Sequence, residues 1–285
     1  MSEQTATTTT STRGLRREDQ KRLRKRESAS DSRPPEYIDP DSLMRVPSRT
    51  RRTFITSDFH LFHSNIIKYC NRPYHVEGPN SNPANIAAVN QMDEDILRLF
   101  DRLPLDCDVW NLGDVFYPLD RVVNPTQIRL MQSMVARMKG EGGRRRLLLV
   151  LGNHDVGRFP RRPRDEFYLN LGFDQVYATP VVLEGKYVLS HEPFFLEKGS
   201  PMINLYGHLH DQVLKKDDFC IDYQRYRRQL QRAEREGTEK PKLEISWPER
   251  EVDLANYRSM CLDFNKGILE WTDDTFTVAS PIWTA

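Results

Sequence analysis

Five short segments, each placed after an apolar, strand-like run, limit what this 285-residue chain can fold into. They contain five of its seven histidines, together with aspartates, glycines and an asparagine. In chain order they are Asp58-Phe59-His60, Gly113-Asp114, Gly152-Asn153-His154-Asp155, Ser190-His191 and Gly207-His208-Leu209-His210. Sites in open α/β sheets form outside the carboxyl ends of the strands. We therefore expect the five segments to meet at one edge of a sheet.

The hydropathy pattern predicts strands that alternate with helices, followed mostly by strands. An unbroken apolar run over 147–151 indicates a central strand buried on both faces. The periodic apolar residues of 85–102 indicate an amphipathic helix. The other expected elements are helices over 125–139 and 165–172, and strands over 53–57, 108–112, 176–183, 187–189, 203–206, 260–264 and 275–278. This order is typical of an α/β core with one mixed sheet or two stacked sheets.

The first 50 residues differ in composition from the rest. Residues 5–12 are almost all Thr, Ala and Ser, and residues 13–26 are charged with few apolar side chains, which favours disorder. We expect a tail over 1–50 and a folded domain over 51–285. Within that domain, 215–252 is dense in Arg, Glu, Gln and Lys, and we interpret it as a charged surface insertion.

The net charge and the spacing of the cysteines indicate which binding partners and which cellular compartment to expect. The net charge of +1 creates no overall field toward nucleic acid or anionic lipid. We find no apolar run long enough for a transmembrane helix and no apolar secretory segment after Met1. The four cysteines are widely spaced without a C-x-x-C pair, which favours free thiols in a reducing compartment. We therefore expect a cytoplasmic protein without a membrane span.

Two local basic clusters nevertheless leave nucleic acid open as a partner. One lies in the tail at 16–26, and the other is the loop from Arg158 to Arg164. Arginines in such clusters can contact a phosphate backbone. The composition favours the plainer alternatives, a solvated tail and a solvated loop.

The donor types in the five segments suit a pair of divalent cations. Asp114, in its Gly-Asp turn, can bridge two metals about 3.5–4 Å apart. Carboxylate, imidazole and amide donors together favour Mn, Fe, Zn or Ni over calcium. Residues two apart in a strand point the same way, so Asp58 and His60 can aim at one point if the strand continues through them. Glycine, whose missing Cβ allows close approach, stands directly before ligand-type residues at Gly113, Gly152 and Gly207.

The order of the segments resembles the signature of the calcineurin-like metallophosphoesterase superfamily, which is D-x-H, G-D, G-N-H-D/E, H and G-H-x-H. The resemblance runs from Asp58 to His210, and the stretch from Asp58 to Ile67 resembles the D-x-H-F-x-H-x-N-I-I opening of a small bacterial and phage branch. It implies an α/β sandwich of two mixed β-sheets flanked by helices. It also implies a hydrolase that cleaves a phosphate ester, either a phosphodiester such as a nucleotide or a small phosphomonoester, by metal-bound hydroxide.

The resemblance also implies how two divalent metal ions would be held. One metal would take Asp58, His60, Asp114 and His210. The other would take Asp114, Asn153, His191 and His208.

Five further residues are expected around these ligands. By the same resemblance, His154 would face the leaving-group oxygen as general acid or charge stabiliser, and Asp155 would orient it through its ring N–H. His63 and Asn65 either contact substrate or only cap the helix that follows. Arg72 is a candidate phosphate contact through its bidentate fork, with a surface ion pair as the alternative.

One difference from a related enzyme class argues against one of the possible activities. Protein Ser/Thr phosphatases carry G-D-x-V-D-R-G where this chain has Val115-Phe116-Tyr117-Pro118 after its Gly-Asp, so we do not expect a protein phosphatase. A binding scaffold that keeps the fold without turnover is the alternative function. Scaffolds of that kind usually lose ligands or the histidine of G-N-H, and all of these residues are present here, which favours catalysis.

Overall fold

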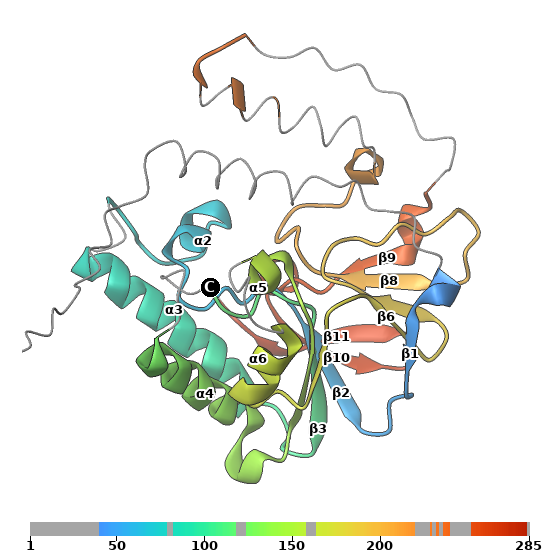
Figure 1. Ribbon diagram of the computed structural model, residues 1–285, viewed down its shortest axis with the longest axis horizontal. Coiled ribbons are helices and arrows are strands. Elements are labelled where there is room, and N and C mark those ends of the chain that lie inside the picture. Colours follow the sequence, from blue (N-terminus) through green and yellow to red (C-terminus); the bar gives the residue numbers. More distant parts are fainter. Residues whose placement is uncertain are drawn as a thin grey trace, which may run out of the picture. The chain divides into compact units, whose positions relative to one another are not determined.

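The computed structural model describes residues 40–78, 82–117, 124–157, 164–219, 229, 232–233, 236–239 and 252–283. They form an α/β sandwich in which two mixed β-sheets, one of six and one of five strands, are flanked by helices (Figure 1). The predicted fold class is therefore confirmed.

The six-stranded sheet has the order β11-β10-β2-β3-β4-β5. Four of its strands pair in parallel: β2 (Arg52–Thr56), β3 (Cys107–Asn111), β4 (Arg146–Val150) and β5 (Gln175–Tyr177). An antiparallel hairpin, β10 (Gly267–Thr272) and β11 (Thr275–Pro281), joins at β2. Thr56 pairs with Asn111 and Asn111 with Leu149, so the carboxyl ends of the central strands lie at one edge.

The five-stranded sheet has the order β1-β6-β7-β8-β9. Its strands are β1 (Met44–Val46), β6 (Val181–Leu183), β7 (Tyr187–Leu189), β8 (Ile203–Tyr206) and β9 (Tyr257–Ser259). β6 and β7 pair antiparallel, and the other neighbours pair in parallel. A bridge between Ser57, after β2, and Cys261, after β9, connects the two sheets at the edge where the five short segments rich in histidine and aspartate begin.

Side-chain alternation along the central strands fills two separate cores. In β4, Leu148 and Val150 pack between the sheets with Leu189 of β7. Leu147 and Leu149 point to the other face and pack with residues of the helices. The apolar run is therefore buried on both faces, as predicted, because each face of the sheet is covered by another layer.

The longer helices cover the outer face of the six-stranded sheet (Figure 1). They are α2 (Ser64–Tyr69), α3 (Pro83–Asp101), α4 (Pro125–Lys139) and α6 (Arg164–Leu171). α4 begins at a capping box between Asn124 and Gln127 and ends at Gly140, whose φ of 73° suits glycine. Shorter helical turns are α5 (Asn153–Gly157), α8 (Leu262–Asn265), and the 3₁₀ turns Pro40–Ser42, Glu141–Gly143, Lys216–Phe219 and Leu254–Asn256.

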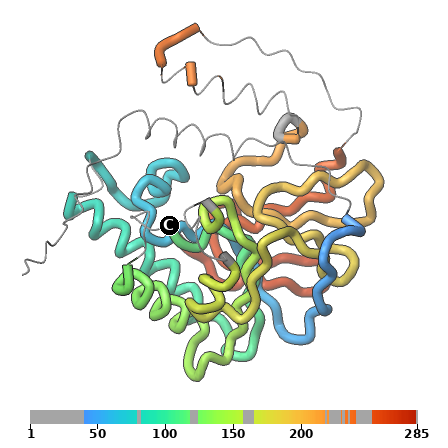
Figure 2. The backbone as a smooth tube through the Cα atoms, in the orientation of Figure 1, coloured from blue at the N-terminus to red at the C-terminus, as the bar shows by residue number. Residues whose placement is uncertain are grey.

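The expected tail over 1–50 extends too far, because the 3₁₀ turn Pro40–Ser42 and the strand β1 lie within it. β1 pairs in parallel with β6, and Figure 2 shows this N-terminal strand alongside the five-stranded sheet. Arg49 adds an ion pair of 2.8 Å with Glu184 and lies over the Trp271 ring. A strand of three residues is too short to show a hydropathy period in the sequence, and β1 can be identified only from its pairing with β6. Residues 1–39 of the expected tail lie outside the described residues.

Two predicted strands also need correction. The expected strand over 176–183 is divided into β5 and β6, which belong to different sheets because β5 pairs with β4, whereas β6 pairs with β1 and β7. The expected strand over 260–264 is the short helix α8, which ends at Lys266 with a left-handed φ of 56°. β10 was not predicted. Most of the expected insertion over 215–252 lies outside the described residues.

The structure describes three of the four cysteines and allows its helices to be compared with membrane-spanning ones. Cys70, Cys107 and Cys261 are buried free thiols, and Cys220 lies outside the described residues. Among the helices that the structure describes, none combines the length and the apolar character that crossing a bilayer demands.

Two truncations test the corrected boundary. Deleting residues 1–50 removes β1 and Arg49, and we expect it to lower the melting temperature by roughly 3 °C or more compared with deleting 1–39. Burial of Val46 contributes about 1.5 kcal/mol or more, and each kcal/mol corresponds to roughly 2–4 °C in a domain of this size. Thermal unfolding of both variants measures the difference. Equal melting temperatures would show that β1 contributes nothing.

Candidate metal centre

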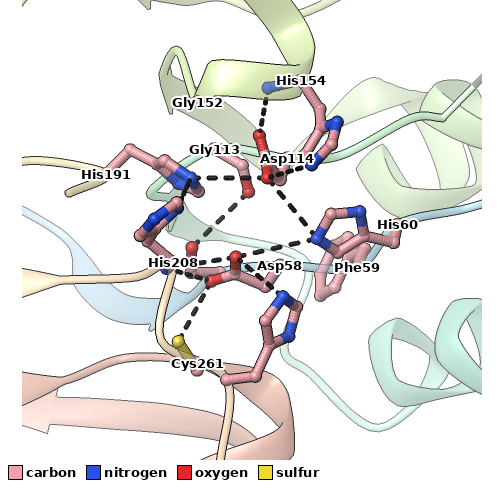
Figure 3. Close-up of polar contacts among 12 residues, drawn as sticks. Asp58, Phe59, His60, Gly113, Asp114, Gly152, His154, His191, His208 and Cys261 are labelled. Atoms are coloured by element: carbon pink, nitrogen blue, oxygen red, sulfur yellow. Dashed lines mark hydrogen bonds and ion pairs between the residues drawn. The ribbon is translucent and has the colours of Figure 1, made fainter. Parts of the chain in front are cut away.

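The five short segments predicted to carry the metal ligands meet at one edge of the two sheets (Figure 3). Asp58 follows β2, Asp114 follows β3, and Asn153 follows β4 in the six-stranded sheet. His191 follows β7 and His208 follows β8 in the five-stranded sheet. The expectation that all five lie at carboxyl ends of strands is confirmed.

The convergence of the side chains comes from turns rather than from strand pleating. Asp58, His60, Asp114, His208 and His210 all have left-handed backbones, with φ between 51° and 70°. The condition that strand geometry continues through Asp58 and His60 is therefore not met. Non-glycine residues in this region cost of order 1–3 kcal/mol each and persist only where surrounding contacts impose them. Such a concentration of strained ligand-type residues is typical of a functional site.

The buried carboxylates of Asp58 and Asp114 each turn one oxygen toward the imidazole rings. The His208 N–H donates to both oxygens of Asp58, at 2.9 Å to Oδ2 and 3.1 Å to Oδ1, and the Cys261 thiol donates to Oδ2 at 3.1 Å. Asp114 accepts the His154 backbone N–H at 2.9 Å through Oδ1. Asp58 Oδ1 and Asp114 Oδ2 then face the cluster of rings. These backbone bonds restrain the orientation of both carboxylates beside the rings.

One set of donors surrounds Asp58 Oδ1. His60 Nε2 lies 3.8 Å from it and His210 Nε2 lies 3.9 Å from it. His60 Nε2 is also 3.4 Å from Asp114 Oδ2. These four residues are the predicted ligands of one metal, and their donor atoms face one another.

The second set lies on the other side of Asp114. His191 Nε2 is 3.4 Å from Asp114 Oδ2 and 2.8 Å from Asn153 Oδ1. His208 Nδ1 is 3.2 Å from both Asn153 Oδ1 and His191 Nε2. The structure therefore brings the predicted ligands of the second metal together as well, with Asp114 shared between the sets.

The His60 ring gives a direct test of whether these donors suit a cation. Its side chain is buried, and neither Nδ1 nor Nε2 has a hydrogen-bond partner in the described part of the chain. A buried polar atom without a partner costs about 1–3 kcal/mol. A cation between His60, Asp58 and Asp114 would satisfy Nε2, so the residues fit a metal.

Charge around the cluster favours added positive charge. Burial alone would raise the pKa of Asp114, but His191, His60 and His154 hold that pKa below its ordinary value. Burial alone would lower the pKa of His191, but Asp114 raises it to about 10. Burial dominates at His60 and lowers its pKa. Protons on the rings and cations between them are alternative ways to balance the two carboxylates.

Three glycines allow the segments to approach one another. A Cβ on Gly152 would lie 2.2 Å from Asp114 Oδ1, and one on Gly207 would lie 2.6 Å from Asp58 Oδ2. A Cβ on Gly113 would lie 2.5 Å from the Gly152 nitrogen. The predicted role of these glycines in close approach is confirmed for the backbone.

Asp155, which was predicted to orient the His154 ring, bonds other groups among the described residues. Its carboxylate accepts backbone N–H groups from Asp114 at 2.7 Å, Gly152 at 2.8 Å and Val115 at 3.3 Å, and it also bonds the Tyr168 hydroxyl. Burial, with the negative charge of Asp114, raises the pKa of Asp155 to about 7. Three N–H donors at the ends of β3 and β4 determine its direction, so Asp155 clamps these two turns together.

Arg72 is not placed to contact a phosphate in this structure. Its side chain is buried and forms an ion pair with Asp263, whose carboxylate also contacts His210 Nδ1 at 2.9 Å. Asp263 is not among the residues predicted from the sequence, because it follows the insertion and has no motif around it. Burial alone would raise the pKa of Asp263, but Arg72 and His210 lower it to about 2.

His154 lies at the open side of the cluster. Its side chain is 35% exposed, and Nε2 is 3.8 Å from Asp114 Oδ2. By distance alone it could join His60 and Asp114 around a cation, so its predicted role outside the ligand set stays a prediction.

His63 and Asn65 begin the helix beside the cluster. His63 precedes α2 without forming a side-chain cap, and its ring stacks on Tyr117 at 3.5 Å between centroids. Asn65 is half-buried in the first turn of α2. The capping alternative is thus wrong for His63, and substrate contact by either residue stays a prediction. The basic residues 16–26 and 158–163 lie outside the described residues.

Comparisons with known proteins return relatives without a stated function. No family model matches the chain. An uncharacterized protein of Methanocaldococcus jannaschii is 27% identical over 105 residues, which are 37% of this chain and 47% of that protein, so the match spans about half of the relative's length. A crystal structure of a protein of unknown function from Aquifex aeolicus has 19% identity and a TM-score of 0.37, covering 75% of this chain and 91% of that one.

Substitution of Gly152 tests the close approach at Asp114. We expect Gly152→Ala to destabilise the fold by about 1–3 kcal/mol through overpacking and to weaken Mn²⁺ binding, because the new methyl displaces the Asp114 carboxylate. Gly199→Ala is the control, since its Cβ meets open space and pays only for its φ of 84°. Thermal unfolding and Mn²⁺ titration measure both effects. Unchanged Mn²⁺ binding in Gly152→Ala would contradict the assigned geometry.

Proposed function

We propose that this chain is a phosphoesterase that depends on two divalent metal ions, as in the calcineurin-like metallophosphoesterase superfamily. The observation that carries the proposal is the position of Asp114 Oδ2, which lies 3.4 Å from Nε2 of both His60 and His191. A carboxylate between two donor sets has the arrangement needed to bridge a pair of cations. A structural zinc site has four ligands, fewer than the seven residues gathered here.

The donor set limits the metal and its chemistry. Carboxylates, imidazoles and one amide oxygen suit Mn, Fe, Zn or Ni. When bound, such a pair lowers the pKa of water to near neutrality and neutralises phosphoryl oxygens. The protein holds the donors through backbone N–H groups and glycine contacts, so it can keep their directions fixed during turnover.

His154 is the residue we assign to the leaving group. Its backbone N–H is anchored on Asp114 Oδ1, while its ring is partly exposed at the open side of the centre. From there it can donate a proton to the departing oxygen or stabilise its charge. The stacked rings of His63 and Tyr117 flank this side and are candidate substrate contacts, together with Asn65.

The substrate class is a phosphate ester, and two kinds fit the proposal. Phosphodiesters, including nucleotides and nucleic acid, and small phosphomonoesters both present oxygens that a metal pair can neutralise.

The buried free thiols support a reducing compartment, so we propose that the activity is cytoplasmic.

Turnover of synthetic esters tests the proposal. We expect the full chain with Mn²⁺ to hydrolyse bis-p-nitrophenyl phosphate or p-nitrophenyl phosphate, and a chelator to abolish the activity. The ratio of the two rates separates a diesterase from a monoesterase. Absence of turnover with Mn²⁺, Fe²⁺, Zn²⁺ and Ni²⁺ would favour a non-catalytic binding scaffold instead.

Two substitutions separate metal binding from proton transfer. We expect His154→Ala to keep both metal equivalents and lose about 10²–10⁴-fold in kcat, the usual contribution of general acid catalysis. We expect Asp114→Asn to reduce the metal content at both positions, because both share its carboxylate. His75→Ala is the control, since His75 is exposed. Metal analysis with kinetics decides, and loss of metal from His154→Ala would contradict its assignment.

A further inference from the structure

A buried ion pair lies behind one side of the proposed metal centre. Arg72 Nε is 2.9 Å from Asp263 Oδ1, and Arg72 Nη2 is 2.8 Å from Asp263 Oδ2, which makes the pair bidentate. Both side chains are fully buried, and the Trp283 ring lies over the guanidinium, 5.2 Å from Cζ to the ring centroid. A planar guanidinium in this fork geometry is rigid and always charged. The pair therefore forms a fixed point in the interior.

The guanidinium also holds the turn that carries two proposed ligands. Arg72 Nη2 donates to the Asp58 carbonyl at 2.9 Å, and Nη1 donates to the Phe59 carbonyl at 2.8 Å. Asp58 and His60 flank Phe59 in this turn, and both have left-handed backbones. These two bonds from a charged donor help to hold the strained turn, together with the N–H groups of Asp58 and His60, which donate to the Gly113 and Asp114 carbonyls.

The carboxylate of the pair orients a third proposed ligand. Asp263 Oδ2 lies 2.9 Å from His210 Nδ1, which leaves Nε2 of that ring facing Asp58 Oδ1. A carboxylate on the far nitrogen of a metal-binding histidine fixes the tautomer and the ring direction. One ion pair thus governs Asp58, His60 and His210, which all belong to the same donor set.

The second donor set is held by different contacts. His191 Nδ1 lies 2.7 Å from the Leu112 carbonyl, and Asp114 is fixed through Asp155 and the His154 N–H. Neither Arg72 nor Asp263 contacts this set directly among the described residues. The two positions share Asp114 and are linked by the His208 N–H that donates to Asp58, but the contacts of Arg72 and Asp263 support only the first of them.

We propose that Arg72 and Asp263 are positioning residues that set the metal affinity of the Asp58–His60–His210 position and leave the Asn153–His191–His208 position unchanged. This inference rests on the proposed two-metal function. It predicts that one of the two metal equivalents can be weakened by changes that touch no ligand.

Calorimetric titration of the metal-free full chain with Mn²⁺ tests the inference. We expect two equivalents for the unaltered protein. In Asp263→Asn we expect one equivalent to bind about 10- to 100-fold more weakly, the usual effect of losing such a partner, and the other to change less than twofold. Asp108→Asn is the matched control, because Asp108 is a buried carboxylate paired with Arg51 and Arg146 at the opposite ends of the strands. It should keep both affinities.

The outcomes distinguish this inference from the proposed function. Fewer than two equivalents in the unaltered protein would overturn the two-metal function and the inference with it. Two equivalents in the unaltered protein, with both affinities in Asp263→Asn unchanged or lowered equally, would overturn the inference alone. If Asp263→Asn does not fold by circular dichroism, Arg72→Lys replaces it, since lysine keeps the charge but not the fork. A selective loss in that variant supports the inference, and unchanged or equally lowered affinities overturn it.

Discussion

Two carboxylates, those of Asp58 and Asp114, lie in the interior beside a group of imidazole rings, and the arrangement around them depends on how their charge is stabilised. A buried charge requires partners of opposite charge or several hydrogen bonds. Here each carboxylate accepts a backbone N–H from another segment, so that charge stabilisation also ties the segments together. The five turns thus form one unit instead of five separate loops.

The sheets determine where that unit can form. Parallel pairing of β2, β3 and β4 brings three carboxyl ends to one edge, and the parallel pair β7–β8 brings two more from the second sheet. The Ser57–Cys261 bridge joins the two sheets at this point. Glycines at the crossing points remove the methyl groups that would otherwise keep the turns apart. Topology supplies proximity, and the glycines make the final approach possible.

The two donor sets differ in how they are supported. An ion pair between Arg72 and Asp263 holds one set, whereas backbone groups and Asp155 hold the other. Asp155 was expected to orient His154, and Arg72 to contact a phosphate or to form a surface ion pair. Both instead stabilise backbone turns, because a buried carboxylate or guanidinium satisfies its hydrogen bonds with the nearest N–H or carbonyl groups. Support of this kind determines the directions of the ligands.

The sequence by itself determined the α/β class, most of the strands, and the residues that meet at the site. Apolar runs, glycines and metal-ligating residue types are local properties that can be read along the chain. Tertiary structure alone decided the strand β1, the division of 176–183 between two sheets, and the pairing of Asp263 with Arg72 and His210. The pairing of β1 and the contacts of Asp263 join residues between about 50 and 190 positions apart. No local pattern specifies which distant group will satisfy a buried charge, since that choice is made by packing.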